Sequence, residues 1–269
     1  MTKVQAMTAD WFTGSPGGLP SVGLWLGLAN AYSAELCATI GFDWLLIDAE
    51  HAPNTVQTVL HQLQAISGTA SSAVVRPPTT DADLIKRYLD IGAQHLLLPM
   101  IDSAEQARDA VAASRYPPHG TRGVGSALAR ASEWGGRTDY LATANTGIRL
   151  IAQIETPAAV AAVDDIAETD GIDAVFVGLS DLAATMGHLG QPAHPDVQRA
   201  FAHVVTRARH AGKPVGTLAA SPALAHSAEE YGCSFIAVGT DVGLLAGGGR
   251  RLLARARGAA DGPVPATGY

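Results

Sequence analysis

Short apolar runs alternate with longer helix-like stretches along most of this chain, and this alternation constrains the fold more than any other feature. Eight short runs have the composition of buried strands and are bounded by turn residues. They are residues 22–26, 44–47, 73–75, 95–98, 150–154, 174–177, 215–218 and 235–238. Repeated strand and helix units of this kind build parallel sheets that are covered by helices.

Helices are predicted between the runs because apolar residues there recur with a period near 3.6. The clearest stretches are residues 55–66, 81–89, 104–114, 157–167 and 195–211. Eight such units within about 240 residues predict a single (β/α)₈ TIM barrel over residues 21–258. An open doubly wound sheet is the alternative, but no G-x-G-x-x-G motif opens a helix after the first strand.

Three segments interrupt the alternation. Residues 1–20 and 259–269 contain Gly and Pro without periodicity, so we expect a loosely attached N-terminal arm and C-terminal tail. Residues 115–147 form a long insertion rich in Gly, Pro and Arg. Loops of this length in a compact domain are usually functional or disordered, and we expect a functional lid.

The composition excludes several classes of protein. Hydrophobic residues make up 47% of the chain and charged residues 16%, which favours a large buried core over disorder. The formal net charge of −7 argues against a nucleic-acid partner. No apolar run approaches the ~20 residues that cross a bilayer, and residues 1–20 lack a signal-peptide block, so we expect a cytoplasmic protein without a membrane partner. Two cysteines, Cys37 and Cys233, support neither a disulfide framework nor a thiolate zinc site.

Polar side chains follow several of the predicted strands. In a (β/α)₈ barrel the reaction site lies at the carboxyl ends of the strands, so these residues are the candidates for chemistry. The residues concerned are Asp48, Glu50, His51, Arg76, Gln153, Glu155, Ser180 and Asp181. One guanidinium, one imidazole and several carboxylates should therefore meet at one mouth of the barrel. This gathering of reactive side chains at one end of the barrel favours an enzyme over a binding module.

Glu155 and Asp181 follow the fifth and sixth strands, so their carboxylates should lie side by side. Such oxygen ligands suit an octahedral Mg²⁺ or Mn²⁺ ion. The alternative is that each residue merely caps the helix that begins after it. Glu50 could also compete as a ligand.

Arg76 and His51 are the candidate reactive groups. Arg76 precedes Pro77 and Pro78, which favour an extended backbone, and its planar fork of donors suits a carboxylate or an enolate oxygen. Its alternative role is an ion pair with Asp48 or Glu50 that ties two strand ends together. His51 is placed for proton transfer near neutral pH, the alternative being a structural histidine.

The three lysines supply a negative argument. Lys3 lies in the arm, Lys86 on the third helix and Lys213 before the seventh strand, so none follows a strand end. A Schiff-base mechanism needs its amine inside the mouth. Carbonyl chemistry here is therefore expected to depend on a metal.

Seven motifs, in order along the chain, carry a family resemblance. They are residues 23–27 (GLWLG), 46–54 (LIDAEHAPN), 75–77 (VRP), 115–118 (RYPP), 122–125 (RGVG), 153–156 (QIET) and 177–182 (VGLSDL). With these motifs the chain resembles the HpcH/HpaI aldolase family over residues 19–257.

The resemblance implies a class II aldolase that reversibly splits 4-hydroxy-2-oxo acids into pyruvate and an aldehyde. The family requires a divalent metal (Mg²⁺, Mn²⁺ or Co²⁺), and no organic cofactor is expected. Carried over by motif, Glu155 and Asp181 are the metal ligands, Arg76 stabilises the pyruvate enolate, and His51 relays a proton. Asp48 would lie beside the departing hydroxyl. The residues implied to bind substrate are Arg76, Gln153, Gly178, Leu179, Ser180 and Leu218.

The resemblance also implies a hexamer in which subunits exchange their last helix. Asp90 matches the family aspartate that pairs with the catalytic histidine, yet the predicted barrel places it on the wrong face of its own subunit. A neighbouring chain would resolve that conflict. This sequence departs from relatives at Leu179 and Ser180, where Pro and Ala are frequent, and at residues 247–249, three glycines in the last helix.

Two other functions fit a similar barrel. A metal-dependent lyase or mutase acting on phosphoenolpyruvate or a dicarboxylic acid would need extra cations, which the ends of the seventh and eighth strands do not offer. A non-catalytic keto-acid-binding protein would bind pyruvate without turnover.

Overall fold

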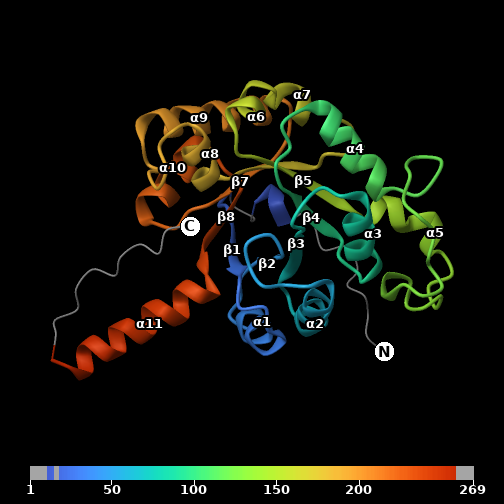
Figure 1. The fold of residues 1–269 in the computed structure, drawn as a ribbon, viewed down its shortest axis with the longest axis horizontal. Coiled ribbons are helices and arrows are strands. Elements are labelled where there is room, and N and C mark those ends of the chain that lie inside the picture. Colours follow the sequence, from blue (N-terminus) through green and yellow to red (C-terminus); the bar gives the residue numbers. More distant parts are fainter. Residues whose placement is uncertain (1–10, 15–17, 259–269) are drawn as a thin grey trace.

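Eight parallel strands close into a barrel in the order of the sequence, from β1 beside β2 to β8 beside β1 (Figure 1). The computed structural model describes residues 11–14 and 18–258. The strands are β1 (Ser21–Leu26), β2 (Trp44–Asp48), β3 (Ser72–Arg76), β4 (His95–Leu98), β5 (Arg149–Ile154), β6 (Ala174–Val177), β7 (Val215–Leu218) and β8 (Phe235–Thr240). The predicted (β/α)₈ barrel and all eight strands are confirmed.

Helices follow the strands, and most of them cover the outside of the barrel (Figure 1). They are α1 (Ala31–Ala38), α2 (Val56–Ile66), α3 (Ala82–Asp90), α4 (Ala104–Ser114), α5 (Tyr140–Thr143), α6 (Pro157–Ala161), α7 (Val163–Ala167), α8 (Leu179–Thr185), α9 (Pro195–His210), α10 (Pro222–Tyr231) and α11 (Asp241–Ala256). The stretch predicted as one helix over 157–167 is divided at Ala162. The other predicted helices are found within one or two residues of their expected ends.

Alternation along each strand decides which side chains enter the barrel, because successive strand residues point to opposite faces. Trp44 and Leu46 of β2 pack in the interior cluster, whereas Leu45 and Ile47 pack toward the helices. Asp48 is the next inward position, at the carboxyl end of β2. By the same alternation, Val74 and Arg76 of β3 both point into the barrel. The site therefore forms the top layer of the barrel interior.

The amino-terminal end of the barrel is closed by a short 3₁₀ helix, η1 (Trp11–Thr13). Trp11 and Phe12 are buried, and the Trp11 ring stacks on Trp44 at a centroid distance of 5.0 Å. The expectation of a loosely attached arm over residues 1–20 is therefore wrong for Trp11–Thr13. The rings of Trp11 and Phe12 fill the amino-terminal end of the barrel, which we call the barrel floor. Residues 1–10 and 15–17 of that arm and the tail 259–269 lie outside the described residues.

The insertion at 115–147 packs at the amino-terminal end of its own barrel. Arg122 bonds Asp90 at the end of α3, and Arg130 donates to the carbonyl of Ile91. A cavity lined by Arg122, Tyr140 and Arg149 lies beneath it. The insertion joins α4 to β5, and a helix-to-strand connection returns to the amino end of the sheet, so it lies away from the mouth of its own barrel. Its function as a lid stays a prediction.

Helix α11 extends away from the barrel (Figure 1). Val242, Leu244, Leu245, Leu252 and Leu253 on this helix are exposed. Across the described residues, every helix is too short or too polar to span a lipid bilayer.

Candidate active site

The centre of the mouth is a buried ion pair between Arg76 and Asp48. These residues are register partners at the ends of β2 and β3. The Nε and Nη2 atoms of Arg76 donate to the two carboxylate oxygens of Asp48 at 3.0 and 2.7 Å. The Trp25 indole donates to the same carboxylate at 3.2 Å, and its ring lies 5.0 Å below the guanidinium carbon. The ion pair considered as an alternative role of Arg76 is therefore present. It joins the ends of β2 and β3 inside the expected site.

Glu50 and His51 lie at the rim of the mouth. Oε2 of Glu50 is 2.9 Å from Nη1 of Arg76 and 3.9 Å from Nε2 of His51. The backbone N–H groups of both residues donate to Asp48, which fixes the turn after β2. Burial raises the pKa of Glu50, with Asp48 and Asp181 adding to the rise and Arg76 opposing it. His51 has a half-exposed side chain, accessible to a substrate.

Glu155 is buried at the end of β5. Its Oε1 accepts the backbone N–H of Met100 at 2.8 Å, and its Oε2 accepts an N–H from Gln153. Burial raises the pKa of Glu155 to about 7 despite these donors, and the charges of Asp181 and Glu50 add to the rise. Three carboxylates therefore influence one another in this part of the mouth.

Neither Glu155 nor Asp181 caps a helix. The N-cap of α6 is Thr156, whose side chain accepts the N–H of Ala159. The N-cap of α8 is Gly178, and Asp181 lies in the first turn of that helix. The helix-capping roles considered as alternatives for Glu155 and Asp181 are therefore wrong.

Gly178 keeps the space above Glu155 and Gln153 open. A Cβ atom at this position would lie 2.7 Å from Oε2 of Glu155 and 3.0 Å from Nε2 of Gln153. Leu179 is buried and Ser180 half-buried at the start of α8, and Leu218 packs against the interior cluster from the end of β7. These expected substrate-binding positions all follow the carboxyl ends of β5, β6 and β7.

Asp90 is the one predicted site residue that lies elsewhere. It ends α3, at the amino-terminal end of the barrel, where Nη2 of Arg122 contacts its Oδ1 at 2.5 Å. Arg122 is itself buried, over the ring of Tyr116. The structure therefore agrees with the expected separation of Asp90 from His51 within one chain.

The described lysines and cysteines lie away from the mouth. Lys86 pairs with Asp83 on α3, and Lys213 donates to the carbonyl of Ile172 before β7. Lys3 lies outside the described residues. Both cysteines are buried, and burial raises the pKa of the Cys233 thiol to about 12.

Three residues of the site were not identified from the sequence. Trp25 supports Arg76 and Asp48 from inside β1, and an alternating strand pattern would have found it. Met100 has a φ of 54°, a backbone conformation uncommon for a side-chain-bearing residue, which no local motif signals. Asp241 accepts the N–H groups of Gly27 and Leu28, and so joins the start of α11 to the turn after β1.

Comparisons with known proteins identify the family to which this barrel belongs. The model of the HpcH/HpaI aldolase/citrate lyase family matches residues 21–247. The chain belongs to this family. A 4-hydroxy-2-oxo-heptane-1,7-dioate aldolase from Salmonella dublin is 56% identical over 238 residues, which cover 88% of this chain and 90% of the relative.

Solved structures of the family share the barrel. An HpcH/HpaI aldolase/citrate lyase family protein from Burkholderia cenocepacia J2315 is 43% identical, with a TM-score of 0.86 over 90% of this chain and 96% of the other. A citrate synthase is 25% identical, with a TM-score of 0.79 over 90% of this chain and 94% of the other. Proteins that share this barrel thus carry names that describe different carbon–carbon bond chemistry.

Proposed function

We propose that this protein is a divalent-metal-dependent aldolase that reversibly cleaves 4-hydroxy-2-oxo acids into pyruvate and an aldehyde. The observation that carries the proposal is the meeting of Arg76, Asp48 and Glu155 at the carboxyl end of one barrel. The 56% identical relative is named for 4-hydroxy-2-oxo-heptane-1,7-dioate, so this acid is the proposed substrate, with succinate semialdehyde as the aldehyde.

Glu155 and Asp181 are the proposed ligands of the cation, and Glu50 remains a competing third carboxylate. The donor set fits a Mg²⁺, Mn²⁺ or Co²⁺ ion because oxygen ligands suit all three. The raised pKa of Glu155 points the same way, because a cation in contact would relieve the burial and repulsion that keep its proton bound. A bound divalent cation polarises the keto acid and lowers the free energy of its enolate.

Arg76 orients and stabilises the pyruvate half of the substrate. A guanidinium carries five N–H donors in a plane, and Asp48 fixes that plane by accepting two of them. Such a preorganised group is suited to an oxygen that gains negative charge during the reaction. Trp25 holds the guanidinium from below, so the donors cannot turn away from the mouth.

His51 is the proposed carrier of the proton on the C4 hydroxyl. Its imidazole lies at the rim beside Glu50, and imidazole is the side-chain group suited to proton transfer near neutral pH. In cleavage it would accept the hydroxyl proton, and in synthesis it would return it. Gln153 is proposed to contact the keto acid because it lies at the end of β5, where its side-chain amide donates to Glu155.

A neighbouring subunit is proposed to complete the site. Asp90 would orient His51 of another chain, with the insertion 115–147 brought to that mouth at the same time. Exposed apolar side chains on α11, on α1 (Tyr32 and Leu36) and just after α1 (Ile40) offer surface for such an assembly. A hexamer with an exchanged last helix is the assembly we propose.

One experiment tests the function directly. The protein is incubated with a panel of aldehydes, pyruvate and Mn²⁺, and products are analysed by mass and by chiral chromatography. Formation of 4-hydroxy-2-oxo acids supports the aldolase. If pyruvate binds while no aldehyde adds to it and no hydroxy-keto acid is cleaved, the protein is a keto-acid binder and the proposal is wrong.

A further inference from the structure

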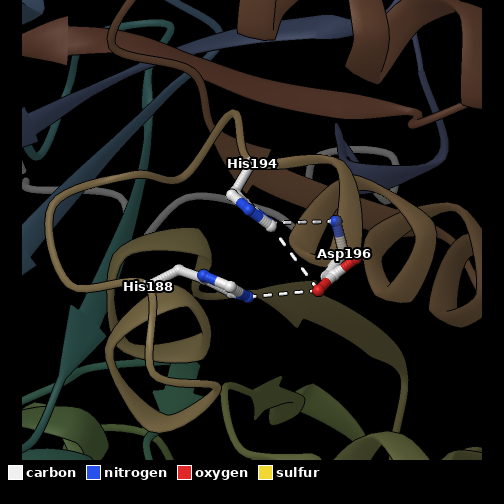
Figure 2. A group of neighbouring side chains, drawn as sticks. All are labelled: His188, His194 and Asp196. Carbon is white, nitrogen blue, oxygen red and sulfur yellow. Dashed lines mark hydrogen bonds and ion pairs between the residues drawn. The ribbon is translucent and has the colours of Figure 1, made fainter.

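A cluster of two histidines and one aspartate lies outside the site described above. Among residues 11–14 and 18–258, His188, His194 and Asp196 are the one group of three potential ligand side chains whose donor atoms all lie within 4.8 Å of one another. Nε2 of His188 is 3.3 Å from Oδ2 of Asp196, and Nδ1 of His194 is 3.9 Å from the same oxygen. Figure 2 shows the two imidazoles side by side, turned toward this carboxylate.

The backbone holds these residues in place from both sides. α8 ends in a turn where Gly187 has a φ of 84°, and the N–H of His188 donates to the carbonyl of Ala183 at 2.7 Å. This bonding is typical of a helix end closed by a left-handed residue. At the other side, His194 is the N-cap of α9 and Asp196 lies in its first turn. The side chains therefore project from two fixed helix ends.

We propose that His188, His194 and Asp196 bind a transition-metal cation such as Zn²⁺. Imidazole nitrogen with one carboxylate is a donor set that suits Zn²⁺, Ni²⁺ or Cu²⁺, whereas Mg²⁺ prefers oxygen alone. Ligand atoms ~2.1 Å from a tetrahedral zinc ion lie about 3.4 Å apart, close to the His188–Asp196 distance of 3.3 Å. All three side chains are partly exposed, so an ion can reach them from solvent.

The existing contacts direct one carboxylate oxygen of Asp196 at the histidines, whose stacked rings would turn to bind an ion. Arg199 contacts Oδ1 of Asp196 and leaves Oδ2 directed at the histidines. Burial works against ionisation, but Arg199 and the two histidines keep the pKa of Asp196 below its usual range, so the carboxylate is charged at neutral pH. Nδ1 of His194 accepts the N–H of Asp196 at 3.2 Å, so an ion bound through Nδ1 would displace this N-cap bond.

The consequence of binding would be a bridge between two helices. The ion would join the end of α8, the helix that carries Asp181, to the start of α9. The site is nonetheless separate from the carboxylates of the mouth and shares no ligand with them. It can therefore be tested whether or not the protein is an aldolase.

Equilibrium dialysis against buffered Zn²⁺, with excess Mg²⁺ present and no affinity tag on the protein, tests the proposal. His188→Gln and His194→Asn should each lower bound zinc by one ion per chain, and asparagine keeps an N-cap acceptor for α9. The matched control is His61→Gln, the same change on an exposed face of α2, which should bind as much zinc as the wild type. Circular dichroism verifies that each variant is folded.

A second measurement locates the ion without any substitution. Anomalous diffraction at the zinc edge from wild-type crystals should give a peak between His188, His194 and Asp196. Equal zinc content in the wild type and both cluster variants, or an anomalous peak confined to other residues, would overturn the proposal. The aldolase proposal fails on different grounds, namely the absence of turnover, so the two outcomes are distinguishable.

Discussion

The guanidinium of Arg76 holds both carboxylate oxygens of Asp48 through two parallel hydrogen bonds, at 3.0 and 2.7 Å. Both side chains are almost completely buried, with 3% and 0% of their surfaces exposed. Breaking such a pair by truncation would leave a buried charge unpaired, which costs about 3–5 kcal/mol. Tests of the arginine's chemical role must therefore keep its charge.

Arg76→Lys keeps the charge and loses the planar fork. We expect turnover to fall by roughly 10²- to 10³-fold, the usual effect of losing one donor to a developing negative oxygen. Exchange of the pyruvate methyl protons into heavy water, followed by NMR, isolates enolisation. Exchange at the wild-type rate in a folded variant would reduce Arg76 to a tie between two strands.

Trp25→Phe removes the indole donor to Asp48 and keeps an aromatic ring below Arg76. We expect the free energy of unfolding to fall by about 1–2 kcal/mol, because a buried acceptor loses a hydrogen bond. Denaturant unfolding measures this. Trp134→Phe, the same change at an exposed position, is the control and should alter stability by less than about 0.5 kcal/mol.

Gly178→Ala should disturb the proposed metal ligands while the barrel stays folded. The added methyl group would lie 2.7 Å from Oε2 of Glu155, so that carboxylate must move. Manganese affinity, measured by electron paramagnetic resonance, should fall at least ~10-fold. Gly249→Ala, at a position with open space around its Cβ, is the control and should bind Mn²⁺ as the wild type does. Unchanged affinity in Gly178→Ala would separate Glu155 from the metal.

Removal of the metal with a chelator should abolish turnover, and Mg²⁺ or Mn²⁺ should restore it. Borohydride with pyruvate should not label the chain, because Lys86 and Lys213 lie on the outer helix α3 and in the turn before β7. Intact-mass spectrometry checks the labelling. A pyruvate adduct on a lysine would replace the metal mechanism with a Schiff base.

Mixing His51→Ala and Asp90→Ala chains tests the proposed shared site. Each variant alone should lose activity, since an imidazole fixed by a carboxylate is a stronger base. Subunit exchange should regenerate some sites with both groups intact, and mass spectrometry of the assembly verifies that mixed oligomers form. Mixed oligomers without recovered activity would leave Asp90 as the partner of Arg122 alone.

Local patterns were sufficient to predict most of the architecture. Each strand is a short apolar run with turn residues on both sides, and this pattern can be recognised without knowledge of distant residues. The polar residues after the strands followed from the same reasoning, because the carboxyl ends of parallel strands must share one rim. Asp48, Arg76 and Glu155 were therefore named correctly as residues of the mouth.

Contacts between distant segments decided the rest. Trp11 and Phe12 have no periodicity, yet they close the barrel floor because Trp44 and Phe235 offer aromatic surface there. The insertion 115–147 was predicted as a functional lid, and only its salt bridge to Asp90 shows that it packs at the amino-terminal end of its own barrel.

The sequence by itself determined the repeated strand and helix units, the end of the barrel that carries the chemistry, and the residue types found there. Closure of the barrel decided how those residues meet: which oxygen of Asp48 faces which nitrogen of Arg76, and that Met100 turns its N–H toward Glu155. The packing of α8 against α9 also brought His188 beside Asp196, across the connection between these two helices. Such pairings depend on positions fixed by packing of the whole chain, which local propensity does not encode.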